Sequence, residues 1–478
     1  MEIQKVSENI WEMPATGDMR VPARIYASDH LMESIRNDQT LIQVRNVAEL
    51  PGIVGHSLAM PDAHMGYGFS IGGVAAMDLE EGVLSPGGVG YDINCGVRIA
   101  RTDLKMEDLR GRAGDLVRQL FSRIPTGVGS SGAIRKLSSR DLSDVLVQGA
   151  AWAVSRGYGT GEDLSFIEER GTYGGADPKA LSSRALERGA PQLGTLGSGN
   201  HFLEISVVDE IFDDRVARVF GLEKDQICIS VHSGSRGLGY QVCDDYLKTL
   251  GKALKTYGIQ LPDRQLACVP FRSPEGKAYF SAMAAAANYA WANRQILMAL
   301  AEETIMKTLG VSPRILNMSL LYDIAHNIVK VETHRVKGKE RRLAVHRKGA
   351  TRAFGPGRQE VPAAYRDVGQ PVLLPGDMGT ASYILVGTDR AMEEAFGSSA
   401  HGAGRVLSRS RAIQQASGRN IAGELEREGI QVLAAGKKTL LEEMPDAYKD
   451  VEEVARVTEE VGISRRVARL RPVGVIKG

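Results

Sequence analysis

Apolar residues recur along this chain in short alternating runs and in one long helical stretch. Alanines and aromatic residues cover most faces of the run 274–309, which predicts a long, buried central helix. A shorter amphipathic helix is predicted over 451–461, where apolar side chains share one face before a terminating glycine. The mostly polar segment 105–190 favours helices followed by Gly- and Ser-rich loops, and it contains no recognisable site.

Strands are predicted where short apolar runs follow glycine-bounded turns. These runs are IGGVAAMDL at 71–79, VRIA at 97–100, FLEISVVDE at 202–210, QICISV at 226–231 and the segment LLPGDMGTASYILVG at 373–387. Helices and strands are interspersed, and no internal repeat, linker or composition break divides them. We therefore predict an α+β fold with mixed β-sheets and surrounding helices, built as one integrated catalytic domain over residues 1–478.

Composition excludes several classes of protein. The chain has 43% hydrophobic residues and a formal net charge of +1, so it can bury a large core and any nucleic-acid site must be a local patch. Its four cysteines lack the density of a secreted disulfide scaffold, and its N-terminus does not resemble a signal peptide. The uncharged Ala-rich run 278–293 is shorter than the ~20 residues of a membrane span. We expect a soluble, cytoplasmic protein with no membrane partner.

The segment GSSAHGAGRVLSRSR, residues 397–411, combines His401 with small residues. Its glycines let the backbone approach a ligand closely, and a helix is predicted to open directly after Gly404. Arg405 and Arg409 would lie beside the first N–H groups of that helix, which favours an anion site. An imidazole above such a site could attack phosphorus as a nucleophile. Taken alone, however, the motif also fits a surface histidine at a glycine-rich helix start.

Potential metal ligands stand at turns or strand ends separated by long intervals. They are Asp92, Cys95, His201, His232 and His326. Such a set can only be assembled by the fold. Thiolate with imidazole suits zinc, carboxylate with imidazole tolerates manganese, and a bridging thiolate could hold two ions for an in-line phosphoryl displacement. The alternatives are a buried structural cysteine and satisfied core histidines.

Other polar features leave their roles open. Asp62 and His64 either line a pocket or act as turn and cap residues, which Asp favours. His201 and Glu204 are three apart, so either the strand begins near Phe202 or only one of the two faces a site. The basic stretch 335–357 contains a single acid, Glu340, and is either a solvated hairpin or a nucleic-acid track.

Distinctive motifs span nearly the whole chain in a fixed order. They are GYDINCG (90–96), GSGNHFLE (197–204), SVHSGSRG (230–237), YDIAHN (322–327), HRKGATRAFGPG (346–357), SSAHGAGR (398–405) and RPVGVIKG (471–478). In sequence and order they resemble the RtcB family of RNA-splicing ligases. The resemblance implies a GTP- and manganese-dependent ligase that joins a 2′,3′-cyclic phosphate or 3′-phosphate RNA end to a 5′-hydroxyl end, in tRNA splicing or RNA repair.

The resemblance also implies a role for each matching residue. Cys95 would bridge two Mn²⁺ ions, with His232 and His326 completing one site. Asp92 and His201 would complete the other. His401 would take GMP from GTP as a covalent adduct and pass it to the RNA 3′-phosphate, after which the 5′-hydroxyl displaces GMP. The GTP pocket would comprise Asn200, His201, Phe202, Leu203, Glu204, His326, Asn327, Pro375, Gly376, Asp377, Met378, Ser382, His401, Gly402, Ala403, Gly404, Tyr448 and Lys477. Residues at RNA or phosphate would be Arg236, Arg352 and Arg409.

Two other functions remain as alternatives. A metal-dependent RNA phosphatase or nuclease would use the same metals without a covalent nucleotide, although His401 in its glycine-rich segment argues against it. A non-catalytic RNA-binding protein is supported only by the basic stretch. The sequence leaves open whether Asp377 accepts from a guanine edge or caps its turn, which RNA is joined, the oligomeric state, and whether an archease-type activating protein is required.

Overall fold

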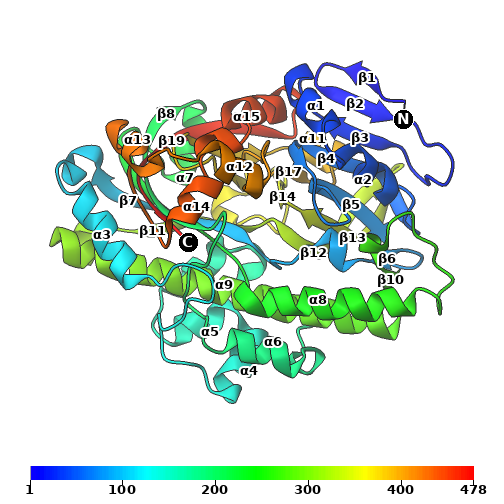
Figure 1. Cartoon of the computed structure of the whole chain (residues 1–478), viewed down its shortest axis with the longest axis horizontal. Coiled ribbons are helices and arrows are strands. Elements are labelled where there is room, and N and C mark those ends of the chain that lie inside the picture. The colour runs from blue at the N-terminus through cyan, green and yellow to red at the C-terminus, as the bar shows by residue number, and fades with distance from the viewer. Residues whose placement is uncertain (1) are drawn as a thin grey trace.

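The computed structural model describes residues 2–478, in which two large sheets carry the fold (Figure 1). The first sheet has the strand order β1-β2-β3-β4-β5-β13-β12 and is antiparallel except between β3 and β4. Its strands are β1 (Gln4–Ser7), β2 (Ile10–Met13), β3 (Ala23–Tyr26), β4 (Ile53–His64), β5 (Ile71–Asp78), β12 (Asn327–Val336) and β13 (Lys339–Lys348).

The second sheet has the order β11-β7-β9-β8-β19-β16-β15, and β18 pairs in parallel with β19. Its strands are β7 (Gly96–Lys105), β8 (Phe202–Ile211), β9 (Gln226–Ser233), β11 (Ser319–Ala325), β15 (Pro371–Leu374), β16 (Ser382–Gly387), β18 (Gln431–Ala434) and β19 (Ser464–Lys477). Two short ladders pair β6 (Val83–Leu84) with β10 (Val269–Pro270) and β14 (Ala350–Arg352) with β17 (Ser398–Ala400). The predicted α+β class and the strands expected at 71–79, 97–100, 202–210 and 226–231 are confirmed.

Helices lie around these sheets (Figure 1). They are α1 (Asp29–Arg36), α2 (Thr40–Val47), α3 (Ala113–Arg123), α4 (Ser139–Gln148), α5 (Ala150–Ser155), α6 (Ser183–Gly189), α7 (Asp214–Phe220), α8 (Arg236–Ala253), α9 (Pro274–Leu309), α10 (Pro313–Leu316), α11 (Asp389–Glu394), α12 (Arg409–Gln415), α13 (Ile421–Arg427), α14 (Lys437–Glu442) and α15 (Val451–Glu460). Among residues 2–478, no helix has the length and apolar character needed to cross a membrane.

The long helix α9 has the bounds that the sequence predicts and runs beside α8 along one side of the molecule (Figure 1). Its first turn is capped by the Ser273 hydroxyl, and Gly310 ends it in a left-handed conformation. The buried Arg294 on α9 pairs with Asp323 and donates to the carbonyls of Asn94, just before β7, and Ser233, at the end of β9. The central helix therefore fixes the strand ends at which the candidate ligands stand.

The helix predicted directly after Gly404 begins instead at Arg409, where the Ser408 side chain caps α12. The intervening chain forms no helix, because Gly404 adopts φ +75° and Arg405 bridges to Tyr448. The helix thus begins later than predicted, while Arg405 and Arg409 both line the cavity with His401, so an anion site here stays a prediction. The predicted amphipathic helix at 451–461 is confirmed as α15.

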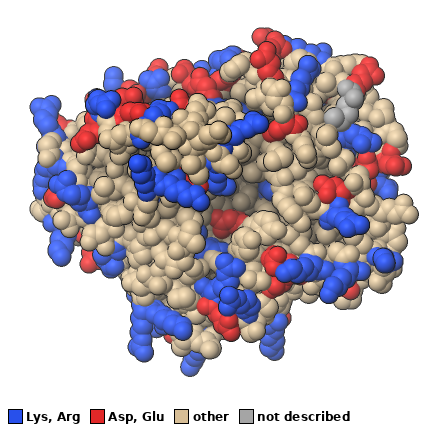
Figure 2. Space-filling view, viewed as in Figure 1, with Lys and Arg blue, Asp and Glu red and all other residues tan. Residues whose placement is uncertain are grey.

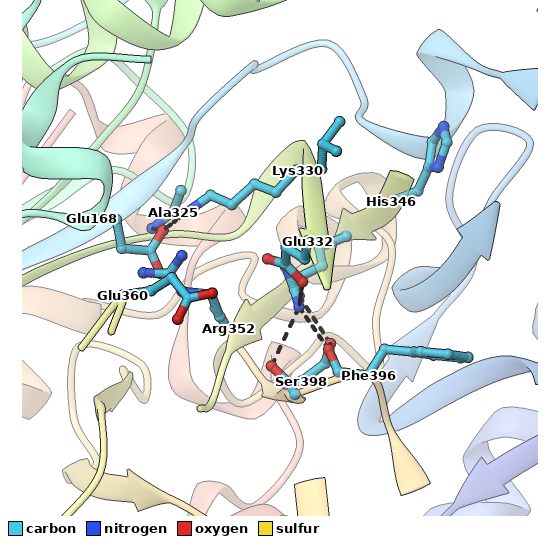
Figure 3. A network of polar contacts seen from close by, with 12 residues as sticks. Glu168, Ala325, Lys330, Glu332, His346, Arg352, Glu360, Phe396 and Ser398 are labelled. Carbon is cyan, nitrogen blue, oxygen red and sulfur yellow. Dashed lines mark hydrogen bonds and ion pairs between the residues drawn. The ribbon is translucent and has the colours of Figure 1, made fainter. Parts of the chain in front are cut away.

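A buried ion-pair network ties β12 and β13 to the segment before β17 (Figure 3). Arg347 Nη1 lies 2.7 Å from Glu332 Oε1, and the His334 ring lies 2.9 Å from the other oxygen of that carboxylate. The same guanidinium donates to the Ser398 hydroxyl and to the Phe396 carbonyl, at 2.8 and 2.7 Å. The network thus holds the chain that leads, through β17, to His401.

Glu332→Gln should lower the melting temperature at pH 7 and flatten its dependence on pH in the acid range. Burial alone would raise the pKa of Glu332, but Arg347 and His334 hold that pKa well below its ordinary value. The stability it contributes is therefore present above the unfolded-state pKa of about 4.3 and is lost as pH falls toward the folded-state pKa. Breaking a buried pair costs about 3–5 kcal/mol. Melting curves from pH 3 to 8 test this.

Glu360→Gln is the control for this prediction, since Glu360 forms an exposed pair with Arg358. Equal losses in the two variants would contradict the prediction. So would a Glu332→Gln protein whose melting temperature keeps the wild-type dependence on pH.

Candidate functional site

A cavity of about 840 Å³ opens on the face that Figure 2 shows hollowed near its centre, with Lys and Arg side chains around the opening. Residues from both large sheets and from the 375–378 and 401–405 loops line it. Its lining arginines are Arg188, Arg236, Arg405 and Arg409. A cavity lined by several guanidinium groups suits a polyanionic ligand.

Two groups of metal-ligating side chains inside the cavity share one thiol. The groups are Cys95, His232 and His326, and Asp92, Cys95 and His201; within each, the ligand atoms lie within 4.8 Å of one another. Cys95 Sγ lies 3.2 Å from His232 Nε2 and 3.3 Å from His201 Nε2. His232 Nε2 in turn lies 3.2 Å from His326 Nε2, and Asp92 Oδ2 lies 2.8 Å from His201 Nε2. The arrangement has the form of two adjacent metal positions with a common sulfur.

Neighbouring strand ends bring these ligands together. Cys95 immediately precedes β7, His201 precedes β8, and His232 lies near the end of β9, opposite Phe202. His326 occupies the junction of β11 and β12, and its N–H donates to the Cys95 carbonyl at 2.9 Å. Since β8 begins at Phe202, both His201 and Glu204 face the cavity, which resolves the alternatives left open by their spacing.

The donor set fits a divalent metal. Burial lowers the pKa of His232 and His326 well below the ordinary value, so both imidazoles are in the neutral form that binds metals. Burial, with Asp92 nearby, raises the pKa of the Cys95 thiol well above its ordinary value. A thiolate in this position needs a compensating cation, which a metal ion bound by these residues would supply. Asp92, paired with His201, has its pKa lowered to about 2 despite burial.

His401 lies next to the potential metal ligands and is held by a buried carboxylate. Its ring centroid is 4.8 Å from that of His326. Its Nδ1 atom lies 2.5 Å from Oδ2 of Asp62, and the same oxygen accepts the N–H groups of His401 and Gly402 at 2.9 and 3.2 Å. Asp62 is fully buried in β4, so it is not the turn or cap residue that its sequence context favours. With Nδ1 bound, the other ring nitrogen, Nε2, is available to react.

Glycine is required where the backbone packs around this histidine. A Cβ atom on Gly404 would lie 2.2 Å from the carbonyl oxygen of Asp62. One on Gly349 would lie 3.1 Å from Cε1 of His401 and 2.2 Å from Ile71. Both glycines have positive φ, so a side chain at either position is excluded by space and by backbone strain.

Most of the other predicted pocket residues line the same cavity. Those that line the cavity are Asn200, Phe202, Glu204, Asn327, Pro375, Gly376, Asp377, Met378, Gly402, Ala403, Gly404, Tyr448 and Lys477. Lys477 Nζ lies 5.5 Å from the Phe202 ring centre and 3.8 Å from Glu443. Burial raises the pKa of Glu204 to about 8 against the opposing effect of Lys477. Asp377 caps its own turn, accepting from the N–H groups of Gly379 and Thr380.

Three predicted site residues do not reach this cavity. Leu203 is fully buried on the opposite face of β8, and Ser382 lies behind the turn, where its hydroxyl accepts the Gly376 N–H at 3.2 Å. Arg352 is buried in the network of Figure 3, 2.8 Å from Glu169 and 3.7 Å from Glu168. We therefore no longer assign Arg352 to RNA or phosphate. Arg236 and Arg409 do line the cavity, and Arg236 also contacts the His201 ring at 3.1 Å.

The structure also adds cavity residues that were not among the predicted site residues. Arg188, Gln192, Tyr91, Tyr240 and Lys348 line it; Arg188 belongs to the segment 105–190, in which no site was predicted, and Gln192 follows that segment. Lys348 belongs to the basic stretch but is buried, donating to the carbonyls of residues 67 and 69. Lys348 lies in the motif HRKGATRAFGPG, which indicated a functional segment, whereas no local sequence pattern indicates a site at Arg188 or Gln192.

Comparisons with known proteins agree along the chain. Residues 43–478 match the family model described as tRNA-splicing ligase RtcB. A protein of that name from Archaeoglobus fulgidus is 55% identical over 478 residues, covering 100% of this chain and 99% of its own length. One from Thermococcus kodakarensis is 53% identical over 477 residues, with the same coverage. One from Pyrococcus abyssi is 56% identical over 385 residues, which cover 80% of this chain and 42% of that protein.

Proposed function

The chain belongs to the tRNA-splicing ligase RtcB family and is an RNA ligase, and from this premise we propose how it joins RNA ends. It uses GTP and two Mn²⁺ ions to join a 2′,3′-cyclic phosphate or 3′-phosphate end to a 5′-hydroxyl end, in tRNA splicing or RNA repair. Residues 1–478 form the catalytic domain for all steps. A cytoplasmic location, where both GTP and RNA occur, belongs to the same proposal.

One observation carries the proposal: an imidazole oriented by a buried carboxylate stands against a pair of potential metal positions. Asp62 binds His401 Nδ1 at 2.5 Å, which leaves Nε2 as the nucleophile. Two Mn²⁺ ions held by Asp92, Cys95, His201, His232 and His326 would neutralise phosphate charge during the displacement. A metal-dependent phosphatase or nuclease would use the same histidine as a general base and would form no covalent nucleotide, so the adduct on His401 separates the two functions.

The proposed reaction has three displacements. His401 Nε2 forms a bond to the α-phosphorus of GTP while the bond from that phosphorus to the oxygen bridging the β-phosphate breaks, and pyrophosphate leaves. An oxygen of the RNA 3′-phosphate then attacks the same phosphorus, and the N–P bond breaks to release His401. Finally the 5′-hydroxyl oxygen attacks the RNA phosphorus, its proton is lost, and GMP leaves. A cyclic phosphate end first takes up water to become a 3′-phosphate.

The cavity supports separate positions for nucleotide and RNA. We propose that Glu204 and Lys477, which converge beside Phe202, bind the guanine edge, because guanine offers both an amino donor and ring acceptors. The 375–378 turn, Tyr448 and the 402–404 loop would complete that pocket, and Asn200 would bind phosphate. Arg236 and Arg409, which both line the cavity, would bind RNA or phosphate oxygens.

Intact-mass measurement after incubation with GTP and Mn²⁺ tests the proposal. We expect the protein to gain the mass of one guanylyl group, and to lose it when RNA bearing a 3′-phosphate is added. The unchanged mass of a fully active enzyme would contradict the covalent mechanism and favour a phosphatase or nuclease. An archease-type activating protein is a candidate partner, and a faster gain of mass in its presence would support that assignment.

A further inference from the structure

Lys449 places a buried ammonium group beside Asp62 without a carboxylate in direct contact, among the described residues. The side chain is 5% exposed, and its Nζ donates to the carbonyl of Ala63 at 2.6 Å and to that of Pro61 at 3.3 Å. Its backbone N–H donates to the carbonyl of Gly404 at 2.9 Å. Lys449 is thus hydrogen-bonded to the residues on both sides of Asp62 and to the loop that follows His401.

Burying the Lys449 ammonium group costs solvation free energy. An ammonium withdrawn from water loses several kcal/mol of solvation in general, and a direct ion pair is the usual compensation. Desolvation lowers the pKa of Lys449 to about 8, opposed mainly by the charge of Asp62 and less by Asp38 and Glu453. An apolar side chain of similar length would fill this space without that loss. The lysine therefore calls for an explanation beyond packing.

The charge of Asp62 explains why a lysine is buried here. This carboxylate is fully buried, and its Oδ2 atom receives all three hydrogen bonds from residues 401 and 402. Its Oδ1 atom has no hydrogen-bond partner in the part of the chain that the structure describes. Burial would raise the pKa of Asp62, whereas His401 and, less strongly, Lys449 lower it. Lys449 is thus a buried cation that compensates the carboxylate without occupying the oxygen that holds His401.

We propose that Lys449 is a positioning residue for the nucleophile: it fixes residues 61–63 and supplies the positive charge behind Asp62, so that Asp62 orients His401. The proposal rests on the guanylylation of His401 described above. It predicts that Lys449 acts on the chemical step through Asp62 and not on nucleotide or metal binding. Tyr448, the neighbouring residue, faces the cavity, whereas Lys449 does not line it.

A double-mutant cycle with Lys449→Met and Asp62→Asn tests this. The rate of guanylylation is measured in a single turnover with labelled GTP and Mn²⁺, together with the GTP concentration for half-maximal rate and the bound Mn²⁺. We expect Lys449→Met to slow the saturated rate by about 10–100-fold, the range for residues that orient a reacting group from behind. Half-saturating GTP and bound Mn²⁺ should stay as in the wild type. In the Asp62→Asn background the same substitution should cost less than about 3-fold.

Lys449→Arg keeps the charge and should recover part of the rate lost in Lys449→Met. Lys449→Gln, which is neutral but keeps a donor, replaces the methionine variant if that protein does not fold. Equal fold-losses in the two backgrounds would overturn the proposal, as would a full rate in the neutral variants or a loss confined to GTP or Mn²⁺ binding. A wild-type protein that never becomes guanylylated would instead overturn the proposed function.

Discussion

Replacing His401 with alanine should eliminate the covalent GMP adduct while leaving the metal centre in place. The substitution removes the ring nitrogen that Asp62 leaves free beside the potential metal ligands. Labelled GTP should leave an acid-labile, alkali-stable label on the wild-type protein, as expected for a nitrogen–phosphorus bond. Asp62→Asn should keep the histidine but lose its orientation, with a fall in rate on the order of 10²–10⁴-fold, by analogy with other carboxylate–histidine pairs.

His30→Ala serves as the control for this experiment, since His30 is an exposed histidine that pairs with Glu453. It should label as the wild type does. If His401→Ala labels equally well, the nucleophile lies elsewhere and the order of steps proposed above fails.

Replacing Cys95 with alanine should remove bound Mn²⁺ from both positions and abolish RNA joining. Cys95 Sγ is the one ligand atom common to both groups, with imidazole nitrogens at 3.2 and 3.3 Å on either side. Without it each position keeps only two protein ligands, too few for a stable site. Elemental analysis of the purified protein should find about two ions per chain in the wild type. The variant should retain far less metal, because its metal affinity should fall by about 10-fold or more.

Cys228→Ala provides a matched control, because Cys228 is also a fully buried thiol but packs in an apolar cluster away from the metal ligands. It should keep its Mn²⁺. A folded Cys95→Ala protein with unchanged metal content would contradict the bridging assignment.

Local sequence patterns predicted the parts of this site that stand at strand ends. The turn glycines beside residues 95, 201 and 232 placed those ligands next to short apolar runs, and the structure joins the runs as adjacent strands β7, β8 and β9. The long helix α9 was also predictable, because 36 consecutive residues carry a helix-compatible pattern with a cap at each end. These features depend on residues close together in the sequence.

Tertiary contacts decided the features that the sequence left open or misassigned. Asp62 and His401 are 339 residues apart, and nothing near either one shows that they pair. Arg352 and Arg347 belong to one basic stretch of the sequence. Inside the protein, however, Arg352 pairs with Glu168 and Arg347 pairs with Glu332 on the neighbouring strand β12. Whether a basic residue faces solvent or a buried carboxylate is fixed by packing, which a charge pattern does not encode.

The fate of the phosphate at the joined RNA end tests the central claim most directly. RNA labelled in its 3′-phosphate is incubated with RNA bearing a 5′-hydroxyl, GTP, Mn²⁺ and the protein. We predict that the label appears in the joined strand, at the junction, and only when both GTP and Mn²⁺ are present. Release of the label as inorganic phosphate would instead identify a phosphatase. Joining of 5′-phosphate to 3′-hydroxyl ends, with the labelled ends left unjoined, would also contradict the account.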